Sequence, residues 1–223
     1  PADDVRGYAK ELAWSLVREY GAKMIVVACN TAASVALGEL VDELPVPVIG
    51  VIDPGARALV RVTRNNKVGV IGTVGTIASG AYVQAIQATG APVALTSAAC
   101  PGFVEFVERD QTTGDELMVL AEKLLAPVRD AGVDALLLGC THYPYLSRAI
   151  SDVMGPGVVL VSSADETAFI VKQELEVTQL KRKDDVKSTG EHRFLSSGDI
   201  AWFAQLGRRL LGPELDTATQ WKN

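Results

Sequence analysis

Two cysteines occupy matching positions in the sequence. Cys29 ends the apolar run MIVVAC and precedes Asn30, and Cys140 ends the run ALLLGC and precedes Thr141. Each thiol is therefore expected where a buried strand gives way to a helix. The positive end of the helix dipole is expected to lower the pKa of such a thiol toward neutrality. A thiol of this kind can both accept and donate a proton.

The pairing of the two thiols indicates a reaction class. Across one pocket, one thiol can remove a proton from a carbon atom while the other delivers a proton to the opposite face, which inverts the centre. The carbanion formed at the α-carbon of an amino acid needs hydrogen-bond donors around its carboxylate. Asn30, Thr31 and Thr141 are expected to supply them. Either cysteine alone would be interpreted as a small core residue.

The expected reaction uses no cofactor and no metal. The sequence shows neither a glycine-rich dinucleotide fingerprint nor a phosphate-binding loop, and no lysine has a setting typical of a pyridoxal Schiff base. The three cysteines are widely spaced, and His142 and His192 are the two histidines, so neither a disulfide framework nor a zinc cluster is indicated. Cys100 lacks polar neighbours of the same kind and is predicted to be structural.

The elements that must position these thiols follow from the apolar runs. Runs rich in Val, Ile and Leu recur at residues 24–29, 46–52, 67–72, 92–97, 135–139 and 158–162. Helical patterns are found at residues 4–20, 114–130 and 164–178. A last strand at 192–197 and a helix at 199–211 are expected to close the chain. Continuous apolar runs suit strands covered on both faces, so the alternation predicts an α/β fold with parallel sheets.

Ligands of parallel sheets collect at the carboxyl ends of the strands, where helix N-termini present free N–H groups. Thr73 and Thr76 are further candidates because they follow the run at 67–72. Ser163 and Glu166 follow the run at 158–162 with the spacing of a capping box, and helix capping is expected to explain them.

Composition limits the possible partners. The net charge is −6, and the basic residues form no stripe of the kind that binds nucleic acid. No apolar run approaches the ~18 residues of a membrane helix, and the start PADDVRGYAKEL lacks the features of a secretory signal. A cytoplasmic protein that binds a small molecule, neither nucleic acid nor membrane, is expected; a homodimer is left open.

The motifs VVACNTAAS and LLLGCTHYP resemble the two signature motifs of the cofactor-independent glutamate racemases. The segments PVIGVIDPGARA, KVGVIGTVGTIASGAY, ACPGFVEFVE and VSSADETA resemble the same family in order and spacing. The resemblance implies interconversion of L- and D-glutamate, which supplies the D-isomer for the bacterial cell wall. It also implies that two cysteines act on opposite faces of the substrate.

Site residues are carried over from the resemblance by motif. Cys29 and Cys140 become the acid and base, and Glu108 and His142 assist Cys140. The substrate is expected to contact Asn30, Thr31, Thr73, Thr76, Thr141 and His142. The family fold implies two similar parallel-sheet lobes that face each other across a pocket. Residues 1–53 and 163–223 would form the first lobe, and residues 54–162 the second.

The chain departs from the family pattern at its start. Members of the family open with a strand that ends in Asp-Ser-Gly and later carry a Pro-Tyr-Gly loop, and this chain begins after both. About 45 residues are expected to be absent, so the first lobe would lack its N-terminal strands and Cys29 its carboxylate partner. A fragment, an incompletely recorded protein and a natural truncation are all open; the start without Met favours a fragment or a processed form.

Two other functions are compatible with these observations. One is racemisation of aspartate or a related amino acid, as in other members of the same superfamily. The other is a truncated relative without catalytic activity that binds a protein partner.

Overall fold

The computed structural model describes residues 1–182, 190–215 and 217–221. The chain divides into two compact units, Pro1–Lys181 and Arg182–Asn223. Helices and parallel strands alternate along the first unit, as the apolar runs predict.

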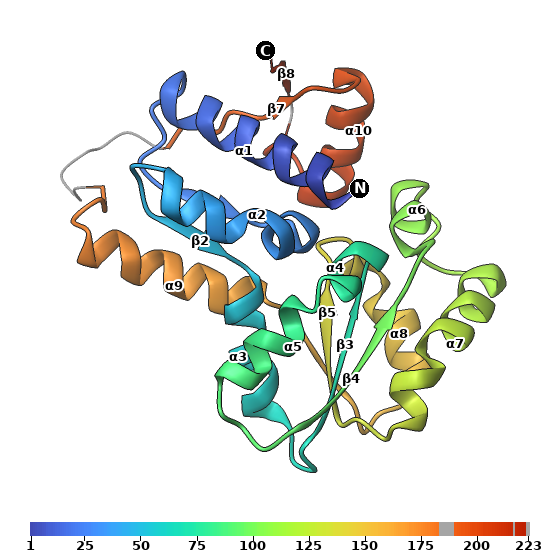
Figure 1. The fold of residues 1–223 in the computed structure, drawn as a ribbon. Helices are drawn as coiled ribbons and strands as arrows, with labels where there is room; N and C mark the ends of the chain where they lie inside the picture. Colours follow the sequence, from blue (N-terminus) through green and yellow to red (C-terminus); the bar gives the residue numbers. More distant parts are fainter. Residues whose placement is uncertain (183–189, 216, 222–223) are drawn as a thin grey trace. The chain divides into compact units, whose positions relative to one another are not determined.

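A four-stranded parallel sheet forms the centre of the first unit. Its strands lie in the order β4 (Ala94–Ala99), β3 (Lys67–Gly72), β5 (Ala135–Gly139) and β6 (Val159–Val161). Every residue of β5 is buried, which explains its uninterrupted apolar sequence. Figure 1 shows the helices α3 (Ile52–Val62) and α5 (Ala81–Ala88) on one side of this sheet, and α7 (Asp115–Asp130) and α8 (Ser147–Met154) on the other.

A second, smaller sheet consists of β1 (Ile25–Val27) and β2 (Val48–Gly50), which also run parallel. The helix α2 (Asn30–Glu43) connects them and packs on one face, and α9 (Ala164–Val177) contacts β2 (Figure 1). Buried residues of α2, such as Leu40, belong to the same hydrophobic core as Leu59 of α3 and Leu137 of β5. One continuous core therefore supports both sheets.

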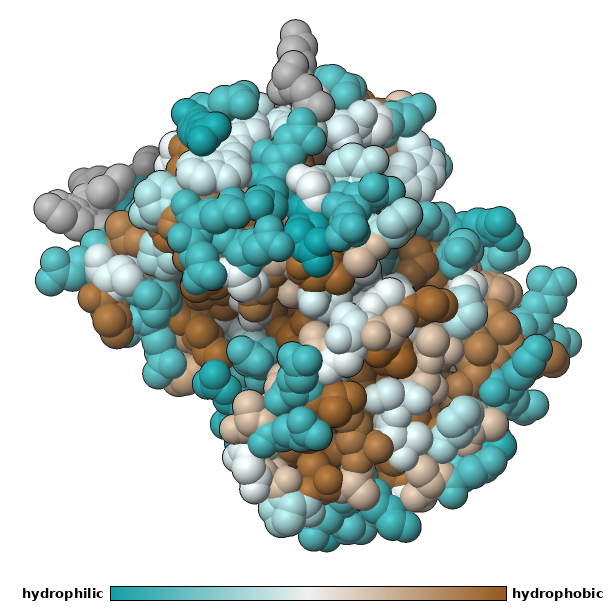
Figure 2. Space-filling view, in the orientation of Figure 1, coloured by the Kyte–Doolittle hydropathy of each residue, from teal (hydrophilic) through white to brown (hydrophobic). Residues whose placement is uncertain are grey.

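The helix α1 (Ala2–Arg18) packs against α2, and charged residues cover their outer faces. In the view of Figure 2, hydrophilic residues lie over α1 and α2, and hydrophobic residues gather over α5 and β4.

Ion pairs join the two helices at their surface. The Nζ atom of Lys10 in α1 lies 2.9 Å from the Glu39 carboxylate and 2.6 Å from the Glu43 carboxylate, both in α2. Surface ion pairs of this kind contribute little to the free energy of unfolding.

Short helices follow the strand ends of the larger sheet: α4 (Val74–Ala78) after β3, α6 (Phe103–Glu108) after β4, and the 3-10 helix η1 (Tyr143–Leu146) after β5. The last residues of β3 and β5, Gly72 and Gly139, are register partners. A Cβ atom at Gly139 would lie 2.7 Å from the carbonyl oxygen of Ile71 and 3.2 Å from Cε2 of Tyr82. The residue before Cys140 therefore needs to be glycine.

The second unit contains β7 (Leu195–Ser196), α10 (Ile200–Leu211) and β8 (Thr219–Gln220). The strand predicted at 192–197 is limited to two residues. The carboxylate of Asp199 accepts a hydrogen bond from the Trp202 amide at 2.9 Å and so caps α10. Among the described residues, no helix combines the length and the apolar character that crossing a membrane requires.

The capping box predicted at the start of α9 is wrong. Ser163 precedes the helix, but its hydroxyl makes no capping hydrogen bond. The hydroxyl oxygen of Ser162 accepts from the Ala164 amide at 3.2 Å instead, and Glu166 pairs with Arg61 of α3. The reason is that Ser163 already has helical backbone angles, which turn its hydroxyl away from the free N–H groups.

We expect Gly139→Ala to lower the free energy of unfolding by about 1 to 3 kcal/mol, because the added methyl group meets a backbone atom of the neighbouring strand that cannot move independently. Urea denaturation followed by circular dichroism measures the change.

The matched control is Gly38→Ala in the interior of α2, where an added Cβ meets nothing within 4 Å. This substitution should stabilise the protein by about 0.5 to 1 kcal/mol, because alanine favours helix. A Gly139→Ala protein as stable as the parent would contradict the close contact.

Candidate active site

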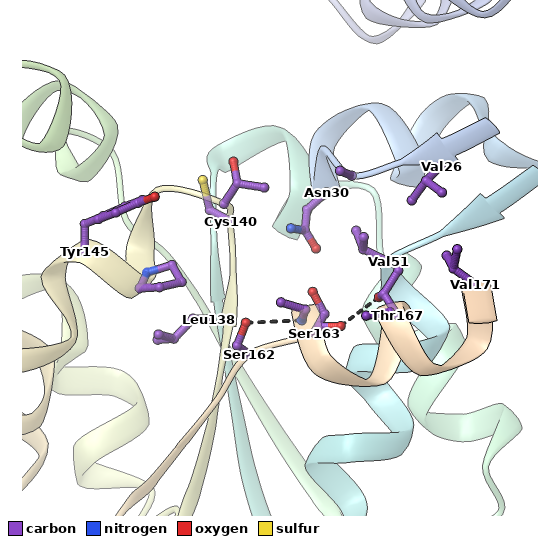
Figure 3. Close-up of a pocket in the computed structure, with 15 residues that line it drawn as sticks. Val26, Asn30, Val51, Leu138, Cys140, Tyr145, Ser162, Ser163, Thr167 and Val171 are labelled. Carbon is purple, nitrogen blue, oxygen red and sulfur yellow. Dashed lines mark hydrogen bonds between the residues drawn. The ribbon is translucent and has the colours of Figure 1, made fainter. Parts of the chain in front are cut away.

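A cavity of about 570 Å³ lies where the two sheets meet. Asn30 and Thr141 line it together with Cys140. Figure 3 shows Val26, Val51 and Val171 on one side of this cavity and Cys140 and Tyr145 on the other. The lining of the cavity thus combines polar side chains at the strand ends with apolar side chains from β1 and α9.

Cys29 itself begins helix α2. Its backbone is extended, and its Sγ atom accepts a hydrogen bond from the Ala32 amide at 3.5 Å, in the position that a serine or aspartate usually occupies. The side chain is exposed, and it is not among the described residues that line the cavity, although its neighbours Ala28 and Asn30 are. The thiol therefore sits at the edge of the cavity with solvent access.

Cys140 follows β5 and is buried. Its Sγ atom lies 3.9 Å from Nδ1 of His142, and Nε2 of the same ring lies 3.3 Å from the Glu108 carboxylate. The hydroxyl of Thr141 lies 3.5 Å from the same Nδ1 atom. The structure therefore brings the predicted residues Glu108 and His142 to the Cys140 side as a chain from carboxylate to imidazole to thiol.

Three threonine hydroxyls form a closed triangle between the two sheets. The Oγ1 atoms of Thr31 and Thr73 are 2.8 Å apart, those of Thr31 and Thr76 3.1 Å, and those of Thr73 and Thr76 3.0 Å. Thr73 also caps α4 by accepting from the Thr76 amide. These predicted residues meet, but they are not among the described residues that line the cavity; here they join the start of α2 to the end of β3.

Burial raises the pKa of the Cys140 thiol above its ordinary value, and the backbone N–H groups of His142 and Tyr143 offset part of this rise. The nearby charge of Cys29 raises the pKa of Cys140 further. The predicted lowering of the pKa is therefore wrong for Cys140. Its strand ends inside the protein, and the four-residue helix η1 that follows has a much smaller dipole than a long α-helix.

Cys100 lies apart from this chemistry. It is 1% exposed, and burial raises its pKa to about 12. Its carbonyl oxygen accepts a hydrogen bond from the Tyr143 hydroxyl at 3.0 Å. This environment agrees with the predicted structural role.

The sequence is similar to those of known proteins. The model of the Asp/Glu/Hydantoin racemase family matches residues 2–169. The glutamate racemase of Corynebacterium diphtheriae is 48% identical over 215 residues, which are 96% of this chain and 80% of that protein. This chain belongs to the Asp/Glu/Hydantoin racemase family.

Solved structures of this racemase family have the same fold. The glutamate racemase isoform RacE1 from Bacillus anthracis has a TM-score of 0.90 at 35% identity, with 100% of this chain and 82% of that chain covered. The glutamate racemase from Francisella tularensis in complex with D-glutamate also has a TM-score of 0.90, at 27% identity, with 100% and 81% covered. The predicted α/β fold with parallel sheets is confirmed.

Sequence reasoning missed several residues of the racemase cavity. Tyr145, Ser162 and Thr167 line it, and Tyr82 donates a hydrogen bond to Asn30, which also lines it. The sequence predicts Ser163 only as part of a capping box with Glu166, and it predicts no role for Ser162. Tyr82 ends the segment KVGVIGTVGTIASGAY, which resembles the family, but the sequence predicts no role for this residue.

We expect the three thiols to react with iodoacetamide at very different rates. Cys29 is exposed and should react first, whereas Cys100 should stay unmodified in the folded protein. Because the pKa of Cys140 is raised, its thiolate fraction is below that of a free cysteine at pH 8, and its rate should keep rising above about pH 8.5. Peptide mass spectrometry at a series of pH values measures each rate.

Urea-unfolded protein, in which all three thiols are free, is the control. A Cys140 rate that is already constant below pH 8 would contradict the raised pKa.

Proposed function

We propose that this chain is a glutamate racemase, which interconverts L- and D-glutamate by proton transfer at the α-carbon. The observation that carries the proposal is the meeting of two cysteine turns at one cavity, in a chain that belongs to the racemase family. The 48% identity to a glutamate racemase and the D-glutamate complex of a structural relative support glutamate as the substrate.

The two thiols act as a pair that shares one proton. Charge on Cys29 raises the pKa of Cys140, behind the larger effect of burial, so two thiolates at once are disfavoured. The reactive state has one thiolate and one thiol. The thiolate removes the α-proton from one face, the thiol delivers a proton to the other, and the roles are exchanged for the reverse reaction.

Polar groups around the cavity stabilise the carbanion. The Asn30 amide and the Thr141 hydroxyl are placed to donate to the substrate carboxylate, and the free N–H groups at the start of α2 add a positive field. Thr31, Thr73 and Thr76 hold the start of α2 against the end of β3, and their hydroxyls can turn toward substrate as it enters.

His142 and Glu108 serve the Cys140 thiol. The Glu108 carboxylate holds one imidazole nitrogen and directs the other toward Sγ of Cys140. A proton on that nitrogen stabilises the Cys140 thiolate, and a neutral nitrogen accepts the thiol proton. This helps Cys140 to react although burial raises its pKa.

The D-glutamate produced serves bacterial peptidoglycan synthesis, which takes place from cytoplasmic precursors; a cytoplasmic location is part of this proposal. A homodimer stays a prediction. The division into a lobe of residues 1–53 and 163–223 and a lobe of residues 54–162 also stays a prediction; the separation of β1 and β2 from β3 to β6 supports the boundary near residue 53.

We expect the full-length protein to bring the circular dichroism signal of either L- or D-glutamate to zero. Cys29→Ser and Cys140→Ser should each lower kcat at least about 10²-fold in both directions, because each direction needs both thiols. In deuterium oxide, the first product formed should carry deuterium at the α-carbon while the remaining substrate keeps its hydrogen.

Cys100→Ala is the matched control and should retain racemisation. Aspartate, tested at the same concentrations, separates glutamate racemisation from aspartate racemisation. A wild-type protein that leaves both glutamate enantiomers unchanged would sink the proposal.

A further inference from the structure

Tyr82 contacts both cysteine turns, although it is not among the described residues that line the cavity. It lies near the start of α5 and is 2% exposed. Its hydroxyl donates a hydrogen bond to Oδ1 of Asn30 at 2.6 Å. Tyr82 and Asn30 belong to different parts of the chain, and both side chains are buried.

This hydrogen bond decides which way the Asn30 amide faces. A neutral phenol has one proton to donate, and here that proton is directed to Oδ1. The Nδ2 group must then point the other way. No described residue accepts a hydrogen bond from Nδ2, and Asn30 lines the cavity. In Figure 3 the amide nitrogen lies on the side that faces Cys140.

The ring of Tyr82 contacts the other cysteine turn. Its Cε2 atom is close enough to Gly139 to leave no ordinary space for a Cβ there, and Gly139 directly precedes Cys140. Tyr82 thus contacts the residue after Cys29 and the residue before Cys140. These two contacts fix the position of the Asn30 amide relative to the Cys140 thiol.

The hydroxyl keeps its proton over the working pH range. Burial raises the pKa of Tyr82 well above its ordinary value, and the negative charges of Cys140 and Asp53 raise it further. A thiolate at Cys140 during turnover therefore raises the pKa of the phenol, which stays protonated and continues to donate to Asn30. The Asn30 amide keeps the same orientation whichever thiol is ionised.

We propose that Tyr82 is a positioning residue: its hydroxyl holds the Asn30 amide so that the Nδ2 group donates to the substrate carboxylate between the two thiols. The inference rests on the proposed function, because it assigns the Asn30 amide to a carboxylate of the amino-acid substrate. Without the hydroxyl, the amide can turn over and present Oδ1, an acceptor that repels a carboxylate.

The test is Tyr82→Phe, with Tyr8→Phe as the matched control on an exposed tyrosine of α1. Loss of one neutral hydrogen bond of about 1 kcal/mol corresponds to a fall of about fivefold in kcat/KM for glutamate. Tyr8→Phe should leave kcat/KM unchanged. Thermal melts of both variants establish that they fold.

A double-mutant cycle with Asn30→Ala separates positioning from general structure. If Tyr82 acts through the Asn30 amide, adding Tyr82→Phe to Asn30→Ala should change kcat/KM less than twofold. Equal falls in both backgrounds would overturn the inference. If Tyr82→Phe does not fold, Asn30→Asp is the second variant, because it presents an oxygen to the cavity in place of the NH₂ group. Asn30→Asp should lower kcat/KM more than Asn30→Ala does. A smaller fall in Asn30→Asp than in Asn30→Ala would overturn the inference.

A readout without turnover keeps this inference separate from the proposed function. The side-chain NH₂ signals of Asn30 in ¹⁵N–¹H spectra are identified by their absence in Asn30→Ala. They should shift or broaden in Tyr82→Phe and stay in place in Tyr8→Phe. A wild-type protein inactive on glutamate would overturn the proposed function, whereas unchanged Asn30 signals in Tyr82→Phe would overturn the hydrogen-bond role of Tyr82 alone.

Discussion

The site depends on side-chain hydrogen bonds that tie the start of α2 to the larger sheet. The hydroxyl of Thr31 meets those of Thr73 and Thr76, and the Asn30 amide meets the hydroxyl of Tyr82. These groups are mostly buried, so a partner removed from any of them would leave a polar atom without water, at a cost of about 1 to 3 kcal/mol. The bonds therefore fix where the turn of Cys29 sits against the end of β5.

Burial and charge oppose each other at the thiols. Enclosing Cys140 excludes water from the thiol and so raises its pKa, and a neighbouring thiolate raises that pKa again. The backbone N–H groups of His142 and Tyr143 act in the opposite direction. Because two thiolates at once are disfavoured, Cys29 and Cys140 together hold one proton. Such a pair suits a reaction in which one proton is removed and one is delivered in each turnover.

Much of the fold follows from local pattern. The continuous apolar runs identify every strand of the two sheets in the first unit, and most clearly β5, which is buried at every position. Pattern was less informative at the ends of elements. The capping-box pattern predicts Ser163, whereas Ser162 accepts the hydrogen bond from the first amide of α9. The helix after Cys140 is one short 3-10 turn. Both differences arise because backbone angles at a strand end depend on packing that a local motif does not encode.

The sequence alone determined the two cysteine motifs, the parallel α/β architecture and, through family resemblance, the reaction class. These properties depend on residue type and spacing along the chain. Tertiary structure decided which groups meet across long separations: Glu108 with His142, Thr31 with Thr73, and Tyr82 with Asn30. It also decided the direction of the Cys140 pKa shift, because desolvation depends on the atoms that surround a thiol in space and not on its neighbours in sequence.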